Sequence, residues 1–306
     1  MRCFRIPLRV RFRGVEERSG VLLRGPHGWG EFSPFPEYGA TESARWLRAA
    51  LEAAADGWPA AVRDAVPVNA IVPAVAPATA HEMTRASGCT TVKVKVADGD
   101  DEARVEAVRD ALGPEGRIRI DVNAAWDVDE AARRINALAR YGLEYVEQPV
   151  ATLDEMAALR RLVDVPVAAD ESVRKAEDPL HIAGLDAAAD LVVLKVQPLG
   201  GVRRALRVAE AVGLPAVVSS AVETSVGLAA GLALAAALPE LPYACGLGTQ
   251  TLLAGDVTRD PLVPVDGMLA VRRPDVDEDA LAPFEVTGRP DGDALLERLH
   301  AAEAAL

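Results

Sequence analysis

Strand and helix patterns alternate with little interruption from about residue 67 to residue 247, and this alternation limits the possible folds more than any other feature. The segments between the strands are amphipathic: in residues 101–112, Val105, Val108 and Leu112 share one helical face and charged residues take the other. Residues 129–141 and 202–212 show the same pattern. The eight expected strands are residues 68–72, 91–96, 117–122, 143–148, 165–170, 191–196, 216–220 and 243–247. Eight such units predict an α/β protein whose parallel strands close into a (β/α)8 barrel of the TIM type.

An open, doubly wound sheet that binds a dinucleotide is the competing interpretation. The glycine-rich sequence that binds a dinucleotide in such a sheet is missing, because Gly246-Leu247-Gly248 lacks the third glycine and lies in the last unit instead of the first. No phosphate-binding Walker sequence occurs either. The pattern therefore favours the closed barrel.

The two ends of the chain do not follow the alternation. We expect residues 1–66 and 262–306 to form a small α+β capping domain, and residues 67–261 to form the barrel that carries the active site. Within the first segment, residues 41–55 predict a helix that begins with the capping signals Thr41 and Ser43. Residues 28–36, rich in glycine, proline and aromatic residues, suit either a lid over a pocket or an ordinary surface turn.

Composition narrows the possible partners. The 306 residues include 33 basic and 46 acidic side chains, which gives a net charge of −13, and no basic stripe is present. We therefore expect no nucleic acid and no anionic membrane as a partner, and a locally positive pocket if the substrate is a small anion. We also expect no signal peptide and no membrane span; residues 228–238 are apolar but too few and predict a packed helix. The oligomeric state stays open, with a monomer among the possibilities.

Cysteine and histidine carry no recognisable motif. Cys3, Cys89 and Cys245 are odd in number and have no metal-binding spacing, so neither a disulfide framework nor a zinc site is predicted. A reducing, cytoplasmic setting fits them best. The four histidines form no metalloprotease or similar motif, and we assign them no chemistry.

Two lysines interrupt an apolar run, Val92-Lys93-Val94-Lys95-Val96, which otherwise has the pattern of a buried strand. Because side chains alternate along a strand, Lys93 and Lys95 point the same way. Lysine is almost never fully buried without a partner, so two of them directed into one interior predict an anionic or catalytic site. The alternative is an edge strand with a solvated lysine face.

Four later strand ends favour an anionic or catalytic site over an edge strand. Asp121, Glu147, Asp170 and Lys195 each end an expected strand, at steps of 26, 23 and 25 residues, about one strand-plus-helix unit each. In a barrel of this type the active site lies at the carboxyl ends of the strands. Three carboxylates that converge there need a cation, and oxygen ligands without histidine or thiol select Mg²⁺, with Mn²⁺ as a possible substitute. Each acid alone could instead cap a helix.

Such a site suits the removal of a proton α to a carboxylate. The metal and the ammonium groups would stabilise the enediolate that develops, with Lys93 and Lys95 on one side and Lys195 on the other. A lysine that acts as the base must be neutral, which repulsion from its neighbour, the metal and partial desolvation favour. Arg119, two residues before Asp121, faces the same side and is either a substrate contact, an orienting residue or part of a buried ion pair.

At these positions the sequence resembles the enolase superfamily, in its muconate lactonizing enzyme-like subgroup. The resemblance covers nearly the whole chain and includes residues 28–31, which are similar to that family's capping loop. It implies that Asp121, Glu147 and Asp170 are the metal ligands and that the three lysines are catalytic. The matching elements, in order, are Lys93-Val94-Lys95, Asp121-Val122-Asn123, Glu147-Gln148-Pro149, Asp170-Glu171-Ser172 and Lys195.

Residues 219–225 and 246–249 are most similar to a dehydrating branch of this subgroup. The resemblance implies a lyase that converts 2-succinyl-6-hydroxy-2,4-cyclohexadiene-1-carboxylate into 2-succinylbenzoate for menaquinone synthesis. Lys95 would remove the α-proton, Lys93 and Mg²⁺ would hold the enediolate, and Lys195 would stay protonated on the opposite side. Ser219 and Gly246 would contact the succinyl group.

Several alternatives remain open. An isomerase such as an N-succinylamino acid racemase uses the same carboxylates with a lysine on each face, and a muconate cycloisomerase shares the motifs. Dipeptide epimerases carry an Asp-x-Asp on the eighth strand, which Gly246-Leu247-Gly248 does not provide. A non-catalytic barrel that binds a ligand is the remaining alternative, from a different class.

Overall fold

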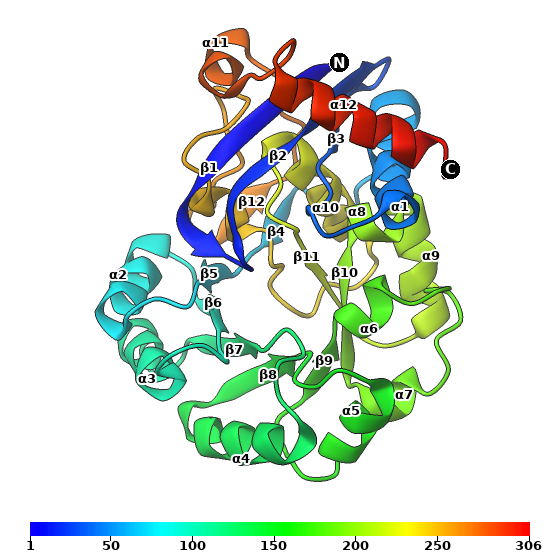
Figure 1. Cartoon of the computed structure of the whole chain (residues 1–306). Helices are drawn as coiled ribbons and strands as arrows, with labels where there is room; N and C mark the ends of the chain where they lie inside the picture. Colours follow the sequence, from blue (N-terminus) through cyan, green and yellow to red (C-terminus); the bar gives the residue numbers. More distant parts are fainter.

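Seven parallel strands form the centre of the molecule in a computed structural model that describes all 306 residues (Figure 1). They are ordered β11-β10-β9-β8-β7-β6-β5, so that strands that follow one another along the chain are neighbours in the sheet. The predicted parallel sheet is confirmed. The strands are β5 (Ala70–Val72), β6 (Thr91–Lys95), β7 (Arg117–Asp121), β8 (Leu143–Glu147), β9 (Val167–Ala169), β10 (Leu191–Lys195) and β11 (Ala216–Ser219).

Helices follow each of these strands and lie on the outside of the curved sheet (Figure 1). The predicted helices at residues 101–112 and 202–212 are found with those bounds, as α3 and α9. The predicted helix at residues 129–141 is α4 followed by a 3-10 turn, Ala139–Tyr141. The helices of the barrel are α2 (Pro77–Ser87), α3 (Asp101–Leu112), α4 (Val128–Leu138), α5 (Leu153–Leu159), α6 (Glu171–Arg174), α7 (Leu185–Ala188), α8 (Val196–Leu199), α9 (Val202–Val212) and α10 (Ser225–Ala237).

The eighth strand, predicted at residues 243–247, is reduced to Cys245 and Gly246. Cys245 makes two main-chain hydrogen bonds with the residues that flank Val68 (2.7 and 2.9 Å), next to β5. Gly246 makes two with the residues that flank Ser219 (2.8 and 3.1 Å), at the end of β11. A proline at position 242 and glycine within the segment disfavour a longer strand. These two residues nevertheless join the two ends of the sheet and close the barrel.

Both ends of the chain meet over one end of the barrel (Figure 1). We call this part the cap. It consists of an antiparallel sheet, two longer helices and one short helix: β1 (Arg2–Phe12), β2 (Val15–Gly25), β3 (Gly28–Phe32), α1 (Ala40–Leu51), α11 (Glu278–Leu281) and α12 (Pro290–Glu303). The short strands β4 (Ala65–Pro67) and β12 (Met268–Ala270) pair where the chain passes between the cap and the barrel.

The first long helix of the cap begins differently from the prediction. α1 starts at Ala40, with Gly39 at the N-cap and no side-chain hydrogen bond there, so the predicted capping role of Thr41 and Ser43 was wrong. Both residues lie inside the first turn, and the Ser43 hydroxyl donates back to the Tyr38 carbonyl (3.4 Å). The helix continues as a π-helical turn, Glu52–Asp56, close to the predicted end at residue 55.

Glu31, at the end of β3, attaches the cap to the barrel. Its buried carboxylate accepts hydrogen bonds from the Ser33 hydroxyl (2.6 Å), the Thr224 hydroxyl and the Gly227 amide (3.0 Å). The last two groups belong to the start of α10, where amides without helical partners favour a negative charge. Burial nevertheless raises the pKa of Glu31 to about 7. The apolar run at residues 228–238 lies almost entirely within α10, which is buried as predicted.

None of the helices is both long and apolar enough to cross a membrane. The three cysteines are buried and form no disulfide.

Candidate active site

Three of the four lysines of the chain lie on two barrel strands: Lys93 and Lys95 on β6, which Lys95 ends, and Lys195 at the carboxyl end of β10. Lys93 and Lys95 are only 4% and 9% exposed, because Val92, Val94 and Val96 pack outward against the helices and turn the lysines into the barrel. Strand β6 has a neighbour on each side, β5 and β7, so the alternative of a solvated edge strand does not apply. Lys195 ends β10, farther round the barrel, and is also 9% exposed.

Three buried carboxylates stand at the same end of the barrel. Asp121 and Glu147 end β7 and β8, and Asp170 follows β9 directly. The parallel register brings Lys95, Asp121 and Glu147 side by side on adjacent strands. Because these residues are evenly spaced along the chain, their charged side chains lie in a row around the carboxyl-terminal rim of the barrel.

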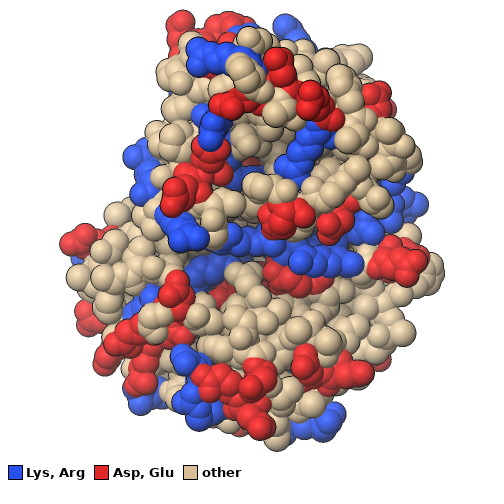
Figure 2. Space-filling view, viewed as in Figure 1, with Lys and Arg blue, Asp and Glu red and all other residues tan.

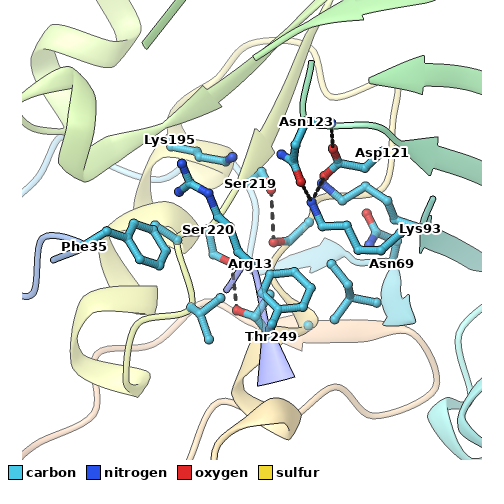
Figure 3. Close-up of a pocket in the computed structure, with 17 residues that line it drawn as sticks. Arg13, Phe35, Asn69, Lys93, Asp121, Asn123, Lys195, Ser219, Ser220 and Thr249 are labelled. Carbon is cyan, nitrogen blue, oxygen red and sulfur yellow. Dashed lines mark hydrogen bonds and ion pairs between the residues drawn. The ribbon is translucent and has the colours of Figure 1, made fainter. Parts of the chain in front are cut away.

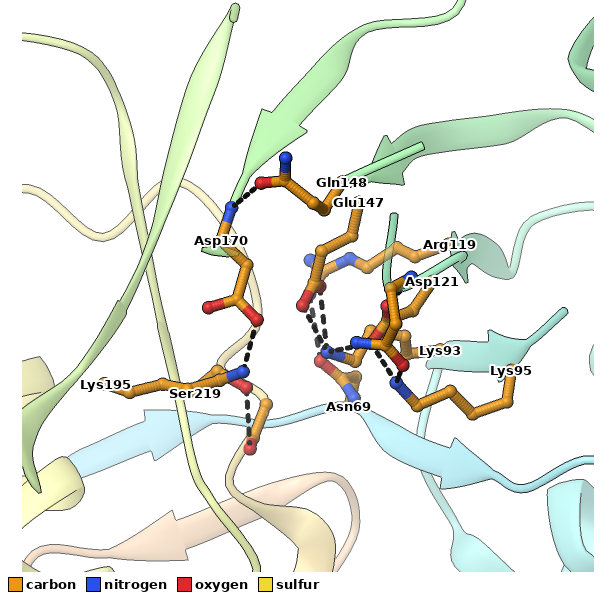
Figure 4. Close-up of polar contacts among 12 residues, drawn as sticks. Asn69, Lys93, Lys95, Arg119, Asp121, Glu147, Gln148, Asp170, Lys195 and Ser219 are labelled. Carbon is orange, nitrogen blue, oxygen red and sulfur yellow. Dashed lines mark hydrogen bonds and ion pairs between the residues drawn. The ribbon is translucent and has the colours of Figure 1, made fainter. Parts of the chain in front are cut away.

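Each ammonium group is paired with a carboxylate (Figure 4). Lys93 Nζ lies 2.8 Å from Glu147 Oε2 and 3.4 Å from Asp121 Oδ2. Lys95 Nζ lies 2.5 Å from Asp121 Oδ2, and Lys195 Nζ lies 2.5 Å from Asp170 Oδ2. Buried charges persist only when they are paired in this way, so opposite charges alternate along the rim.

No set of three acidic, histidine or cysteine side chains is gathered around a common point as a metal requires. Instead, Lys93 stands between Asp121 and Glu147, and Lys195 contacts Asp170. The chemistry of the donors still fits a magnesium ion, because all three are buried carboxylates on neighbouring strands and magnesium prefers oxygen ligands. With a metal ion bound, these carboxylates would contact the ion in place of some of the lysine contacts that they make now.

Burial and neighbouring charges act differently on these groups. Burial raises the pKa of Glu147 to about 7, and the negative charge of Asp121 adds to the effect. Burial opposes the ionisation of Asp121 too, but Lys95 and Lys93 lower its pKa to about 2. Burial lowers the pKa of Lys95, whereas at Lys93 the charges of Glu147 and Asp121 outweigh burial and raise the pKa. The two lysines of β6 therefore differ, and Lys95 holds its proton less firmly.

Asp170 is fixed from the side opposite Lys195. Arg174 Nε donates to Asp170 Oδ1 (3.0 Å), one turn of α6 farther along the chain. The same guanidinium donates to Glu171 (2.5 Å) and to the hydroxyl of Tyr38 in the cap (2.6 Å). Although burial opposes ionisation, Arg174 and Lys195 hold the pKa of Asp170 well below its usual range.

A pocket opens above this rim, between the barrel and the cap (Figure 3). Figure 2 shows Lys and Arg gathered in a band across the middle of the molecule, in a protein of net charge −13. The three lysines, Asp121, Ser219 and Gly246 border the pocket, as a site at the strand ends requires. The remaining lining residues are Phe12, Arg13, Phe35, Asn69, Ile71, Asn123, Ser220, Ala221, Val222, Gly248 and Thr249.

Arg119 lies below the pocket and does not border it. Its guanidinium is fully buried and donates to Glu144 (2.5 Å), the Asn69 side chain (3.0 Å) and the Ala244 carbonyl (2.6 Å), and it lies over the ring of Tyr145. This geometry favours the buried ion pair among the three roles considered for it.

Some residues of the site were missed in the sequence. Asn123 lies within the Asp121-Val122-Asn123 element, accepts a hydrogen bond from Lys95 and donates to Glu171 (3.2 Å), so its place after a strand end was an available signal. Phe12, Arg13 and Phe35 come from the cap. Phe12 and Arg13 carry no local signal, because only the packing of the cap on the barrel brings them to the pocket. Phe35 lies within residues 28–36, for which a lid over a pocket was one of the two interpretations.

Comparison with known proteins agrees with this architecture. Residues 3–54 match the family Enolase N-terminal domain-like, and residues 76–275 match the family Enolase C-terminal domain-like. The structure resembles a crystal structure of muconate lactonizing enzyme from Pseudomonas fluorescens, with a TM-score of 0.79, 24% identity, and coverage of 93% of this chain and 97% of that one. The cap and the barrel are therefore those of an enolase-like protein, and the predicted fold class is confirmed.

Closer relatives are found among curated sequences. The chain is 65% identical to an o-succinylbenzoate synthase of Thermobifida fusca, over 99% of this chain and 96% of the relative. It is 54% identical to one of Mycolicibacterium smegmatis, over 87% of this chain and 84% of the relative. The chain belongs to the o-succinylbenzoate synthase family. The resemblance to the dehydrating branch, and the class of enzyme it implies, a lyase, are confirmed.

Proposed function

We propose that this protein dehydrates 2-succinyl-6-hydroxy-2,4-cyclohexadiene-1-carboxylate to 2-succinylbenzoate, a step of menaquinone synthesis, with Mg²⁺ as cofactor. The observation that carries the proposal is the row of buried lysine–carboxylate pairs under a positive pocket, in a chain of this family. A dianionic substrate needs such a pocket, because the protein as a whole repels anions.

Lys95 is proposed as the base. It ends β6, borders the pocket, and is held at its ammonium by Asp121 and Asn123, which fixes the direction of the side chain. In its neutral form, Lys95 takes the proton from the carbon that bears the ring carboxylate. Lys93, deeper in the barrel and held by both oxygens of Glu147 (3.1 and 2.8 Å), stays charged and stabilises the negative charge that develops.

The second half of the reaction removes the 6-hydroxyl. The electron pair left on the ring expels this group, the proton on Lys95 returns to it, and water and the aromatic product form. The gain of aromaticity favours this step. Lys195, held by Asp170 on the other side of the pocket, stays protonated and attracts the electron-rich ring.

Asp121, Glu147 and Asp170 are proposed to hold the magnesium ion. When bound, the ion supplies a Lewis acid that neutralises the ring carboxylate and lowers the free energy of the anionic intermediate. Arg174 and Gln148 position Asp170: the first donates to its carboxylate, and the second accepts from its amide (3.0 Å). Such supporting contacts orient metal ligands.

The proposed division of the chain gives the cap a role in this chemistry. We propose that residues 1–66 and 262–306 act as a capping domain over a barrel of residues 67–261. The cap places Phe12 and Phe35 on the wall of the pocket, and two apolar rings there exclude water from the carbanion-like intermediate.

N-succinylamino acid racemisation is a second candidate. The observation in its favour is that lysines border the pocket from both β6 and β10, since a base on each face is what racemisation needs. The substrate would share the succinyl group with the cyclohexadiene.

A dehydration assay tests the first proposal. Purified protein is mixed with the cyclohexadiene, and the appearance of the benzoate is followed by absorbance, with and without a chelator and after Mg²⁺ is restored. Turnover that depends on Mg²⁺ is expected. Binding of the substrate without turnover would refute the proposed reaction, and entry of solvent deuterium at the α-carbon of an N-succinylamino acid would reveal the racemase.

A further inference from the structure

The turn that connects β1 and β2 reaches from the cap over the pocket. The strands are joined by Arg13 and Gly14 alone, with Phe12 opposite Val15 in the register. The Phe12 ring lies 5.2 Å from Lys95 Nζ, so the tip of this hairpin touches the barrel. Phe12 and Arg13 both border the pocket (Figure 3).

Arg13 has a backbone conformation that arginine seldom adopts. Its φ is +51° and that of Gly14 is +79°, the pattern of a tight hairpin turn in which both central residues are left-handed. Asparagine, aspartate or glycine normally occupies the first of these positions. Arginine is therefore strained there, and such strain often marks a side chain that serves a function.

The guanidinium of Arg13 is held in a fixed place beside the pocket. It lies 4.5 Å from the centre of the Phe35 ring, and Arg18 lies 4.1 Å from the same ring. Phe35 is buried and packs edge-on against Tyr38 and Trp46, so it is a rigid support. Arg18 itself is engaged by carbonyl groups of Val222 (3.1 Å) and Ser33. Of the two arginines, only Arg13 borders the pocket.

Arg13 also differs from the other cations of the pocket in its partners. Each of the three lysines has a buried carboxylate within 2.8 Å. The only carboxylate within 4 Å of Arg13 is Glu37, at 3.6 Å and with a side chain 53% exposed. The one hydrogen bond of the guanidinium goes to the Tyr38 hydroxyl and is long, 3.4 Å. Most of its donors are therefore available to a ligand.

We propose that Arg13 binds the carboxylate at the far end of the succinyl arm and thereby selects substrates that carry this group. The inference rests on the proposed function. The substrate bears two carboxylates, and the one on the ring is placed at the lysines and the metal site. The other is separated from the ring by a ketone and two methylene groups, and it needs its own cation. A planar guanidinium matches a carboxylate with two parallel hydrogen bonds.

The test compares two substrates in two variants. One substrate is the succinyl cyclohexadiene, and the other is its butanoyl analogue, in which a methyl group replaces the distal carboxylate. Arg13→Asn removes the cation and places a residue suited to a left-handed turn, so the melting temperature should be unchanged or higher. The matched control is Arg11→Gln, which removes an exposed arginine without side-chain partners two residues earlier and changes the net charge equally.

Arg13→Asn should lower kcat/KM about 10- to 100-fold for the succinyl substrate, as expected for the loss of a charge-assisted pair. It should change kcat/KM for the butanoyl analogue by no more than about twofold, and Arg11→Gln should leave both substrates unaffected. An equal loss for both substrates, or no loss for the succinyl one, overturns this inference alone. A wild-type protein that does not turn over the succinyl substrate overturns the proposed function, and the inference with it.

Discussion

The hydroxyl of Tyr38 accepts a 2.6 Å hydrogen bond from Arg174, and through this contact the cap reaches a carboxylate of the barrel rim. The same guanidinium donates to Asp170, and all three side chains are buried. A correctly seated cap thus helps to orient a proposed metal ligand, so the closing of the pocket and the order of the metal site are coupled.

Tyr38→Phe should weaken this coupling without removing a charge. With one partner of Arg174 lost, the Mg²⁺ concentration for half-maximal activity should rise about three- to tenfold, the effect of one net hydrogen bond. Activity measured over a range of Mg²⁺ concentrations checks this. The control is Tyr141→Phe, which removes a hydroxyl that accepts from Arg140 (2.8 Å) at an exposed site. Equal Mg²⁺ dependence in the two variants would speak against the coupling.

Lys95→Ala should abolish turnover. Loss of a general base reduces the rate by roughly 10²- to 10⁴-fold, whereas the fold and Mg²⁺ binding should be largely kept. Single-turnover kinetics, with circular dichroism to verify the fold, provide the measurement. Lys175→Ala, at the exposed fourth lysine, is the matched control and should be fully active. A Lys95→Ala protein with normal turnover would disprove the assignment of the base.

Asp170→Asn should lower the affinity for Mg²⁺. An amide supplies a weaker oxygen ligand, leaves Lys195 without its charged partner and removes one of the two carboxylates that pair with Arg174. Isothermal titration with Mg²⁺ should show an affinity lower by about 10- to 100-fold. Asp178→Asn changes an exposed carboxylate in the following loop and serves as the control. A normal titration curve for Asp170→Asn would count against its role as a ligand.

Stability should depend on the ionisation of Glu31. Its pKa is about 7 in the folded protein, against an ordinary 4.5, so between these values the folded state binds more protons than the unfolded state. The free energy of unfolding should therefore fall as the pH rises from about 4.5 to 7, by up to roughly 3 kcal/mol from this group. Glu31→Gln removes the dependence, and its stability relative to the wild type should increase through this window.

Urea denaturation at a series of pH values measures the difference between the two proteins. Glu16→Gln, on the exposed side of β2, is the control and should follow the wild type. A stability difference between Glu31→Gln and the wild type that does not change with pH would contradict a raised pKa of Glu31 in the folded protein.

The barrel was largely predictable because its signals are local. Alternating Val and Lys in β6 define which side chains face the interior, and one acidic residue per unit defines the rim. The bounds of α3 and α9 follow from their helical period and from glycine directly after each. The eighth strand is shorter than predicted: Pro242 and Gly246 were available signals against a longer strand, whereas its pairing with the chain next to β5 and β11 follows only from the closed barrel.

The pocket wall was less predictable than the rim. Arg13, Phe35 and Tyr38 lie outside any periodic pattern, and the Tyr38–Arg174 contact joins residues 136 positions apart. The N-cap of α1 shows the same limitation on a smaller scale: Thr41 is a good capping residue, yet the chain enters the helix at Gly39. Tertiary packing decides such details.

Because the eighth strand has only two residues, the barrel is weakly paired at the junction between the chain next to β5 and the end of β11. Five residue pairs are in register between β6 and β7, whereas only four main-chain hydrogen bonds hold Cys245 and Gly246 to both of their neighbours together. Local opening costs least where such pairing is sparse. This weakly paired junction borders the pocket at Asn69, Ser219 and Gly246, so we expect the barrel to open most easily on this side of the pocket.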